Sequence, residues 1–230
     1  MKLGVVTFPG SNCDFDMHYI LGDVLGQEVV QLWHKDHDLK NCDFIILPGG
    51  FSFGDYLRSG AIARFSPIMQ EIMEFADKGG FVYGVCNGFQ ILCESGLLPG
   101  ALLHNDNQKF NCKNVHISVQ SNNALITKNA QKEQVLKIPI AHGEGRFFAD
   151  EETLLNIRRN DQILFKYCDE NGSATEAANP NGSIMNIAGI CNVKRNVFGM
   201  MPHPERAADK HNGNRDGMVI FNSILEGVLA

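Results

Sequence analysis

The chain has 230 residues, of which 44% are hydrophobic and 20% are charged, a composition typical of a globular protein and not of a disordered one. Twenty-six Asp and Glu residues outweigh 20 Lys and Arg residues, and no basic run stands out, which argues against nucleic acid or an anionic membrane as a partner. The first apolar stretch is too short for a signal peptide and no apolar run approaches the ~20 residues of a membrane span, so we expect a cytoplasmic protein.

Short apolar runs that stop at turn residues alternate with segments of helical spacing in the first half of the chain. We expect strands at Leu3–Phe8, Glu28–Trp33, Phe44–Leu47 and Phe81–Val85. We expect helices over Asp14–Leu25, along the stripe of Phe65, Ile68, Ile72, Phe75 and Ala76, and over Gly88–Glu94. This alternation predicts an α/β fold with a doubly wound, mostly parallel sheet and helices on both faces.

The second half of the chain is less regular. We expect an added antiparallel patch that includes strands at Val115–Val119 and Ile138–Ala141. Further along, we expect a helix at Glu151–Arg159, a strand at Ile163–Tyr167, a solvated loop over 169–183, a hairpin of Ile187–Val193 and Val197–Met200, and a final helix at Met218–Leu229. No composition shift marks a boundary, so residues 1–230 are interpreted as one domain.

The seven cysteines are scattered along the chain and include no Cys-x-x-Cys pair for zinc or redox chemistry. Most are therefore expected to be small buried residues in a reducing compartment. Cys86 differs, because it lies between a predicted strand and a predicted helix in the pattern Gly84-x-Cys86-x-Gly88. This pattern is the cysteine version of a nucleophile elbow, in which the helix N-terminus favours the thiolate and the N–H of Asn87 points to a developing oxyanion.

A nucleophilic thiolate needs a base, and the base needs an acceptor that orients it. His203 precedes Pro204, so its backbone is restricted to extended conformations. Side chains two residues apart in an extended segment point to the same side, so we expect Glu205 to lie beside the His203 ring. A proline-rich surface turn is the more common interpretation of such a segment alone, but the cysteine elbow in the same chain favours a functional one.

Two glycines end another predicted strand, at Gly49 and Gly50, and their N–H groups can turn outward at the same edge of the sheet. The chain has no Gly-x-x-x-x-Gly-Lys loop and no Gly-x-Gly-x-x-Gly after a strand, so we expect no nucleotide-phosphate site. A metal site is not indicated either. The segment 141–146 contains three polar side chains between glycines and is compatible with a substrate loop, a partner loop or an ordinary loop.

The segments 84–90 and 202–205 resemble the corresponding motifs of class I glutamine amidotransferases. The longer segments 8–14, 47–63, 139–145 and 199–206 are similar to one branch of that family, whose members serve an ATP-dependent ligase of purine biosynthesis. The resemblance runs along nearly the whole chain. It implies a doubly wound sheet and a Cys–His–Glu triad that hydrolyses glutamine.

The resemblance also assigns roles residue by residue. It implies that Cys86 is the nucleophile, His203 the general base and acid, and Glu205 its orienter. Backbone N–H groups of Gly50 and Asn87 would form the oxyanion hole, and Phe51 and Gln90 would line the glutamine pocket. The ammonia would pass to a large synthetase subunit that holds ATP and Mg²⁺, with a small subunit bridging the two, so this chain itself would need no cofactor.

Three other interpretations remain open. The chain could be a cysteine peptidase or hydrolase built on the same elbow, although such relatives lack a segment like 203–205. It could be a binding module without catalysis, which the presence of Cys86, His203 and Glu205 argues against. It could also supply ammonia to a different synthetase, against which the resemblance of segment 47–63 weighs.

Overall fold

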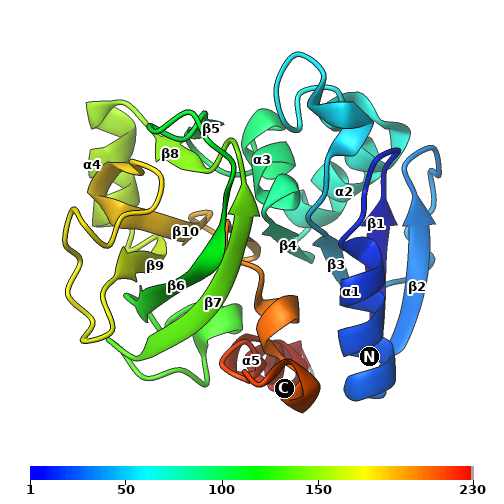
Figure 1. Ribbon diagram of the computed structural model, residues 1–230. Coiled ribbons are helices and arrows are strands. Elements are labelled where there is room, and N and C mark those ends of the chain that lie inside the picture. Colours follow the sequence, from blue (N-terminus) through cyan, green and yellow to red (C-terminus); the bar gives the residue numbers. More distant parts are fainter. Residues whose placement is uncertain (229–230) are drawn as a thin grey trace.

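A nine-stranded mixed sheet forms the centre of the structure, a computed structural model that describes residues 1–228. Its strand order is β2-β1-β3-β4-β11-β10-β9-β6-β7 (Figure 1). The first five of these run parallel: β2 (Glu28–Trp33), β1 (Lys2–Thr7), β3 (Phe44–Leu47), β4 (Phe81–Val85) and β11 (Val197–Met200). The predicted mostly parallel α/β sheet is thereby confirmed.

The antiparallel strands continue this same sheet. They are β10 (Ile187–Cys191), β9 (Ile163–Cys168), β6 (Asn111–Val119) and β7 (Val135–His142). The expected strands of the second half are all present, and β10 and β11 form the expected hairpin. A separate small sheet pairs β5 (Ala101–Leu103) with β8 (Arg146–Phe148), in segments for which no strand was predicted.

Helices pack against the parallel half of the sheet, with α1 on β1 and both α2 and α3 on β4. The first helix begins as expected but continues as a π-helix. The helices are α1 (Asp14–His18, continued as a π-helix over Tyr19–Val24), α2 (Pro67–Asp77), α3 (Asn87–Glu94), α4 (Glu151–Arg159) and α5 (Met218–Val228). Short 3₁₀ helices lie at Ser52–Asp55, Ala63–Phe65, Leu125–Thr127, Ile184–Asn186, Pro204–Ala207 and Lys210–Asn212. Leu229, the expected end of the last helix, lies outside the described residues.

One expected core residue is misplaced. The apolar stripe predicts that Phe65 belongs to α2, but Phe65 is 71% exposed and is the last residue of a separate 3₁₀ helix. The cause is Pro67 at the first position of α2, because the residue before a proline is held in an extended conformation. Ser66 has that conformation, so the helical periodicity begins only at Pro67.

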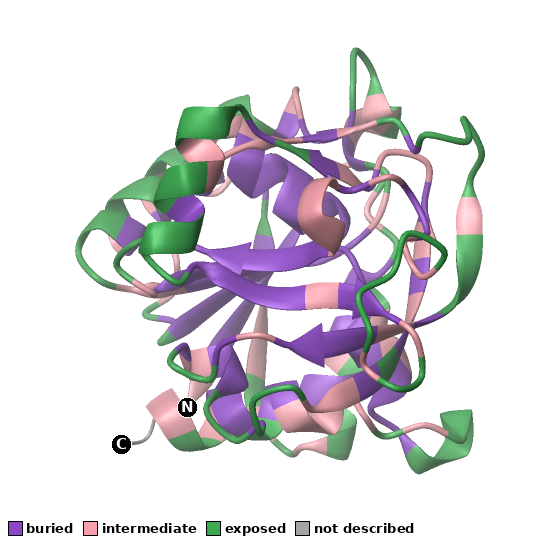
Figure 2. Cartoon of the chain, turned by 90° about the vertical axis from the view of Figure 1, so that its left-hand side faces the viewer, coloured by how far each residue is buried: buried purple, intermediate pink, exposed green. Residues whose placement is uncertain are grey.

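The central parallel strands are buried on both faces, because consecutive residues along them are buried. Figure 2 shows buried strands in purple inside the molecule and exposed segments in green around them. β3 and β11 have no exposed residue. This explains why their sequences are continuous apolar runs and do not alternate between apolar and polar residues. Within residues 1–228, no helix has both the length and the apolar composition that crossing a membrane requires.

The carboxyl ends of the parallel strands bring distant segments together. Loops that follow β1, β3, β4 and β11 begin at Phe8, Pro48, Cys86 and Met201, and all leave the same edge of the sheet. In doubly wound sheets this edge is where ligands bind. A residue that directly follows one of these strands in the sequence therefore lies at this common edge.

Gly88 allows α3 to approach the neighbouring strand closely. A Cβ atom at Gly88 would lie 1.9 Å from the carbonyl oxygen of Leu47. We expect Gly88→Ala to lower the free energy of unfolding by about 2–3 kcal/mol, because backbone on both sides must move. Urea unfolding measures this. Gly22→Ala is the matched control: its Cβ would meet only Val29, at 3.8 Å, so equal losses in both variants would contradict the close-packing argument.

Candidate active site

Cys86 lies at the sharp turn between β4 and α3. Its backbone has φ 50° and ψ −105°, a left-handed conformation that is strained for a residue with a Cβ atom. Gly84 and Gly88 make the turn possible, since a Cβ at Gly84 would lie 2.6 Å from the backbone of Gly88. Strain of this kind is expected of a nucleophile elbow, where the turn presents the side chain at the edge of the sheet.

His203 and Glu205 form a buried pair in the loop after β11. The distance from His203 Nδ1 to Glu205 Oε1 is 2.6 Å, and the two side chains are 2% and 0% exposed. The His203 backbone is extended, with φ −102° and ψ 89°, but Glu205 lies in a 3₁₀ turn. The expected contact therefore forms, although the strand-like alternation from which we predicted it ends at Pro204.

The electrostatics of His203 favour its charged form. Burial opposes that charge, but the carboxylate of Glu205 and the sulfur of Cys86 more than compensate and raise the pKa of His203 well above its usual value. The other ring nitrogen, Nε2, is buried and has no hydrogen-bond partner among the described residues. A base that faces a thiol needs this combination: one nitrogen fixed by a carboxylate and the other available for proton exchange.

Gly50 and Asn87 are the two residues expected to offer backbone N–H groups to an oxyanion, and Gly50 lines the same cleft as Cys86. Gly50 has φ +145°, and a Cβ there would lie 2.9 Å from the backbone nitrogen of Asn12, so only glycine fits. Within residues 1–228, no hydrogen bond from either N–H group is found. The Asn87 side chain accepts from the N–H of Ser52 at 3.2 Å and donates to Gln90 at 3.0 Å, which ties the 3₁₀ turn after Gly50 to α3.

A small cleft of about 190 Å³ opens onto the Cys86 sulfur. Four residues expected at the site line it: Gly50, Phe51, Cys86 and Gln90. His203, Glu205 and Asn87 lie behind this surface and are 1–2% exposed. The structure thus brings Cys86 to the boundary between the cleft and the buried pair. The cleft is smaller than the roughly 300 Å³ at which typical ligand pockets begin, so it suits only a small ligand.

The cleft also contains residues that sequence reasoning did not assign to a site. They are Asp55, Ser59, His104, Phe110, Ala141, His142, Gly143 and Glu144. Two signals were available for part of this set: the glycine-flanked segment 141–146 and the resemblance of segment 47–63, which contains Asp55 and Ser59. His104 and Phe110 lie on irregular loops and Asp55 ends the 3₁₀ helix Ser52–Asp55, and only the tertiary fold brings the three together.

Two carboxyl groups face the cleft. Burial raises the pKa of Asp55 to about 6, and the nearby Glu144 adds to the shift. Glu144 is held by several contacts: its carboxylate accepts from the N–H of Ser59 at 3.0 Å, and its carbonyl accepts from Gln90 Nε2 at 2.6 Å. This acidic side of the cleft suits a ligand that carries an ammonium group.

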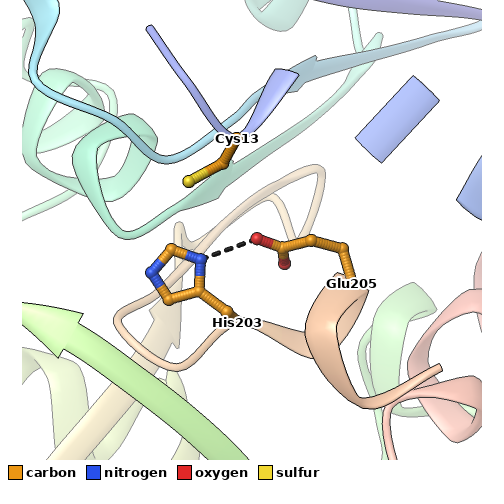
Figure 3. Close-up of side chains that lie close together, drawn as sticks. All are labelled: Cys13, His203 and Glu205. Atoms are coloured by element: carbon orange, nitrogen blue, oxygen red, sulfur yellow. Dashed lines mark hydrogen bonds and ion pairs between the residues drawn. The ribbon is translucent and has the colours of Figure 1, made fainter. Parts of the chain in front are cut away.

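A second thiol lies beside the buried pair. The donor atoms of Cys13, His203 and Glu205 all lie within 4.8 Å of one another, and Figure 3 shows the Cys13 sulfur pointing toward the histidine ring. Thiolate, imidazole and carboxylate are zinc ligands. Arg206 Nη2, however, donates to the Cys13 sulfur at 3.2 Å, so a cation already occupies that side. The prediction of no metal on this chain stays a prediction.

Comparison with known proteins gives consistent results. The chain matches the CobB/CobQ-like glutamine amidotransferase domain over residues 1–218. It is 57% identical over 225 residues to the phosphoribosylformylglycinamidine synthase subunit PurQ of Koribacter versatilis. The aligned residues cover 98% of this chain and 97% of that protein. The subunit of the same name from Nostoc is 55% identical and covers 100% of this chain and 99% of that protein.

Solved structures agree with the fold. A chain in the structure of PurLQS from Thermotoga maritima matches with a TM-score of 0.87 and 42% identity, covering 99% of this chain and 98% of that one. A putative GMP synthase subunit from Thermoplasma acidophilum matches with a TM-score of 0.62 at 14% identity, covering 99% of this chain and 93% of that one. At this low identity the match supports only the fold.

The hydrogen bond between His203 and Glu205 leads to a prediction for titration. We expect Glu205→Gln to lower the pKa of His203, because the cost of burying the charged ring remains while the compensating carboxylate is gone. Histidine NMR titration of the isotope-labelled protein measures this. Burial and the neighbouring Lys35 lower the pKa of His34, with no contribution from His203 or Glu205, so the His34 resonances serve as an internal control and should not move. An unchanged His203 titration would contradict the assigned cause.

Proposed function

This chain belongs to the CobB/CobQ-like glutamine amidotransferase domain family, and from that premise we propose that it is the glutaminase subunit of a phosphoribosylformylglycinamidine synthase. It hydrolyses glutamine to glutamate and ammonia, and the ammonia serves to convert formylglycinamide ribonucleotide to formylglycinamidine ribonucleotide in purine biosynthesis. The observation that carries the chemistry is the strained Cys86 turn beside the buried 2.6 Å contact between His203 and Glu205. Sequence identity of 57% along nearly the whole chain supports the choice of acceptor reaction.

The first half of the proposed reaction is an acyl transfer to sulfur. The Cys86 thiol gives its proton to His203 Nε2, and the sulfur attacks the side-chain carbonyl carbon of glutamine. The N–H groups of Gly50 and Asn87 stabilise the negative charge that develops on the carbonyl oxygen. His203 then returns the proton to the departing nitrogen, the C–N bond breaks, and ammonia leaves behind a glutamyl thioester on Cys86.

The second half regenerates the thiol. A water molecule gives a proton to His203 as its oxygen attacks the thioester carbon, and the C–S bond breaks. Protonation of the sulfur by His203 restores Cys86 and releases glutamate. Throughout, Glu205 keeps the ring in one orientation and stabilises the imidazolium form that exists between the two proton transfers.

Substrate recognition is assigned to the cleft in front of Cys86. We propose that Phe51 and Gln90 border the aliphatic part of glutamine, since both line the cleft next to the sulfur. The carboxyl groups of Asp55 and Glu144 suit the α-ammonium group, because an opposite charge in a half-buried site is strongly favoured. Discrimination against uncharged amides would come from these two residues.

The partners follow from the division of the reaction. We propose that the chain works with a large synthetase subunit that holds ATP and Mg²⁺ and with a small bridging subunit, and that it carries no cofactor itself. The chain has no phosphate-binding glycine motif, which supports this division. The matching PurLQS structure from Thermotoga maritima supports an assembly of this kind. A cytoplasmic location is part of the proposal, since all seven cysteines are free thiols suited to a reducing compartment.

The first test identifies the nucleophile and its substrate together. We expect an electrophilic glutamine analogue to label Cys86 and none of the other six cysteines, because only this thiol faces the histidine and the cleft at once. Mass-spectrometric peptide mapping locates the label, and excess glutamine should prevent it. The Cys86→Ser variant is the control without a reactive thiol. Labelling that glutamine does not suppress would favour the peptidase interpretation.

The second test separates glutamine hydrolysis from synthesis. In the complex reconstituted with its synthetase and small subunits, we expect Cys86→Ser to reduce glutamine-dependent synthesis by at least roughly 10³-fold. Synthesis from added ammonium should persist, since ammonia bypasses this chain. Product formation from the ribonucleotide is measured with each nitrogen source. Loss of both activities would show that the chain does more than supply ammonia.

A further inference from the structure

Cys13 is a buried thiol to which the reaction assigns no step. It lies in the loop after β1, is 3% exposed, and belongs to the cysteines that the sequence marks only as small core residues. Its sulfur lies within 4.8 Å of both the His203 ring nitrogen and the Glu205 carboxylate. In Figure 3 it points at the ring beside the hydrogen bond to Glu205. The contact joins residues that are 190 positions apart in the chain.

The Cys13 sulfur is held in place by two polar contacts. It donates to Asn12 Oδ1 at 3.3 Å and accepts from Arg206 Nη2 at 3.2 Å. Arg206 is itself fixed, because its Nε donates to Asp16 Oδ2 at 3.0 Å. Burial nevertheless raises the pKa of Cys13, which keeps the group a neutral thiol and not a second nucleophile.

The sulfur and the Gly49 backbone lie close against the histidine ring. A Cβ atom built at Gly49 would lie 2.6 Å from His203 Cε1 and 3.1 Å from the Cys13 sulfur. The three groups therefore meet with no room for another atom. A ring packed in this way has little freedom to rotate about its side-chain bonds.

The loop that contains Cys13 is also joined to the oxyanion segment. The Cys13 N–H donates to the Gly49 carbonyl at 3.3 Å, and the Phe51 N–H donates to the Gly10 carbonyl at 3.1 Å. Ser11 and Gly50 face each other across an antiparallel bridge. The Cys13 side chain thus extends from the unit that presents Gly50 to the ring of the base.

We propose that Cys13 is a positioning residue that holds the His203 ring at a fixed distance from the Gly49–Gly50 segment. The inference rests on the proposed glutaminase function. Removing the sulfur opens a space beside the ring, so the ring is no longer confined to the orientation in which Nε2 faces Cys86. Proton transfer is sensitive to small displacements, so the chemical step should slow while glutamine, bound on the other side of Cys86, is held as before.

The variant Cys13→Ala tests this in the reconstituted complex with steady-state glutaminase kinetics. We expect kcat to fall roughly tenfold or more with KM for glutamine little changed. Cys13→Ser keeps a group that donates to Asn12 and accepts from Arg206, and it should restore most of the rate. The matched control is Cys42→Ala, which removes a buried thiol far from the site. Burial raises the pKa of the Cys42 thiol to about 11. We expect this variant to leave kcat unchanged.

A second measurement separates positioning from loss of stability. We expect iodoacetamide to alkylate Cys86 more slowly in Cys13→Ala than in the wild type, because a misplaced ring no longer favours the thiolate. Peptide mapping distinguishes Cys86 from the exposed Cys112, and thermal unfolding is recorded for every variant. Unchanged kcat and alkylation in Cys13→Ala would overturn the proposal, as would an equal loss of kcat in Cys42→Ala. An inactive wild type would instead contradict the proposed function.

Discussion

The side chain of Glu205 is 0% exposed, and a carboxylate in such a place is stable only beside a group that bears positive charge or donates hydrogen bonds. His203 supplies this through its Nδ1 atom, so the two residues depend on each other. The ring then has one nitrogen committed and the other unpartnered within the described residues. Burial would be costly for either group alone, but in the pair it gives an imidazole ring of fixed orientation. The surrounding loops have to accommodate that pair.

The pair is surrounded by loops from four neighbouring parallel strands. The loop after β4 supplies Cys86, the loop after β3 supplies Gly49 and Gly50, and the loop after β1 supplies Cys13. The backbone N–H of His203 donates to the Pro139 carbonyl at 2.8 Å, which attaches the fourth loop to the antiparallel half of the sheet. The site is therefore assembled across both halves, and its geometry depends on the register of the whole sheet.

The sequence predicted those parts of the site that have a local cause. The turn at Cys86 needs glycines at two fixed neighbouring positions, and the prolines around His203 restrict its backbone, so both could be found from short patterns. Asp55, His104 and Cys13 have no such cause, because their place at the site comes from a short 3₁₀ helix, irregular loops and long-range contacts. The paired strands β5 and β8 were missed for a similar reason, since three residues each are too few to show a period. Phe65 shows the opposite error, in which a helical period was extended back across the proline at which the helix begins.

The position of β11 in the sheet has a consequence for biosynthesis. β11 lies between β4 and β10, yet it is the last strand of the sheet to leave the ribosome, and His203 and Glu205 follow it directly. An emerging chain therefore carries the thiol of Cys86 long before His203, and the gap in the sheet closes only when residues near 200 are free to insert. Such non-local pairing is slow compared with local contacts. A chain that ends before residue 203 consequently lacks both members of the buried pair, and the residues proposed for catalysis come together only once the sheet is complete.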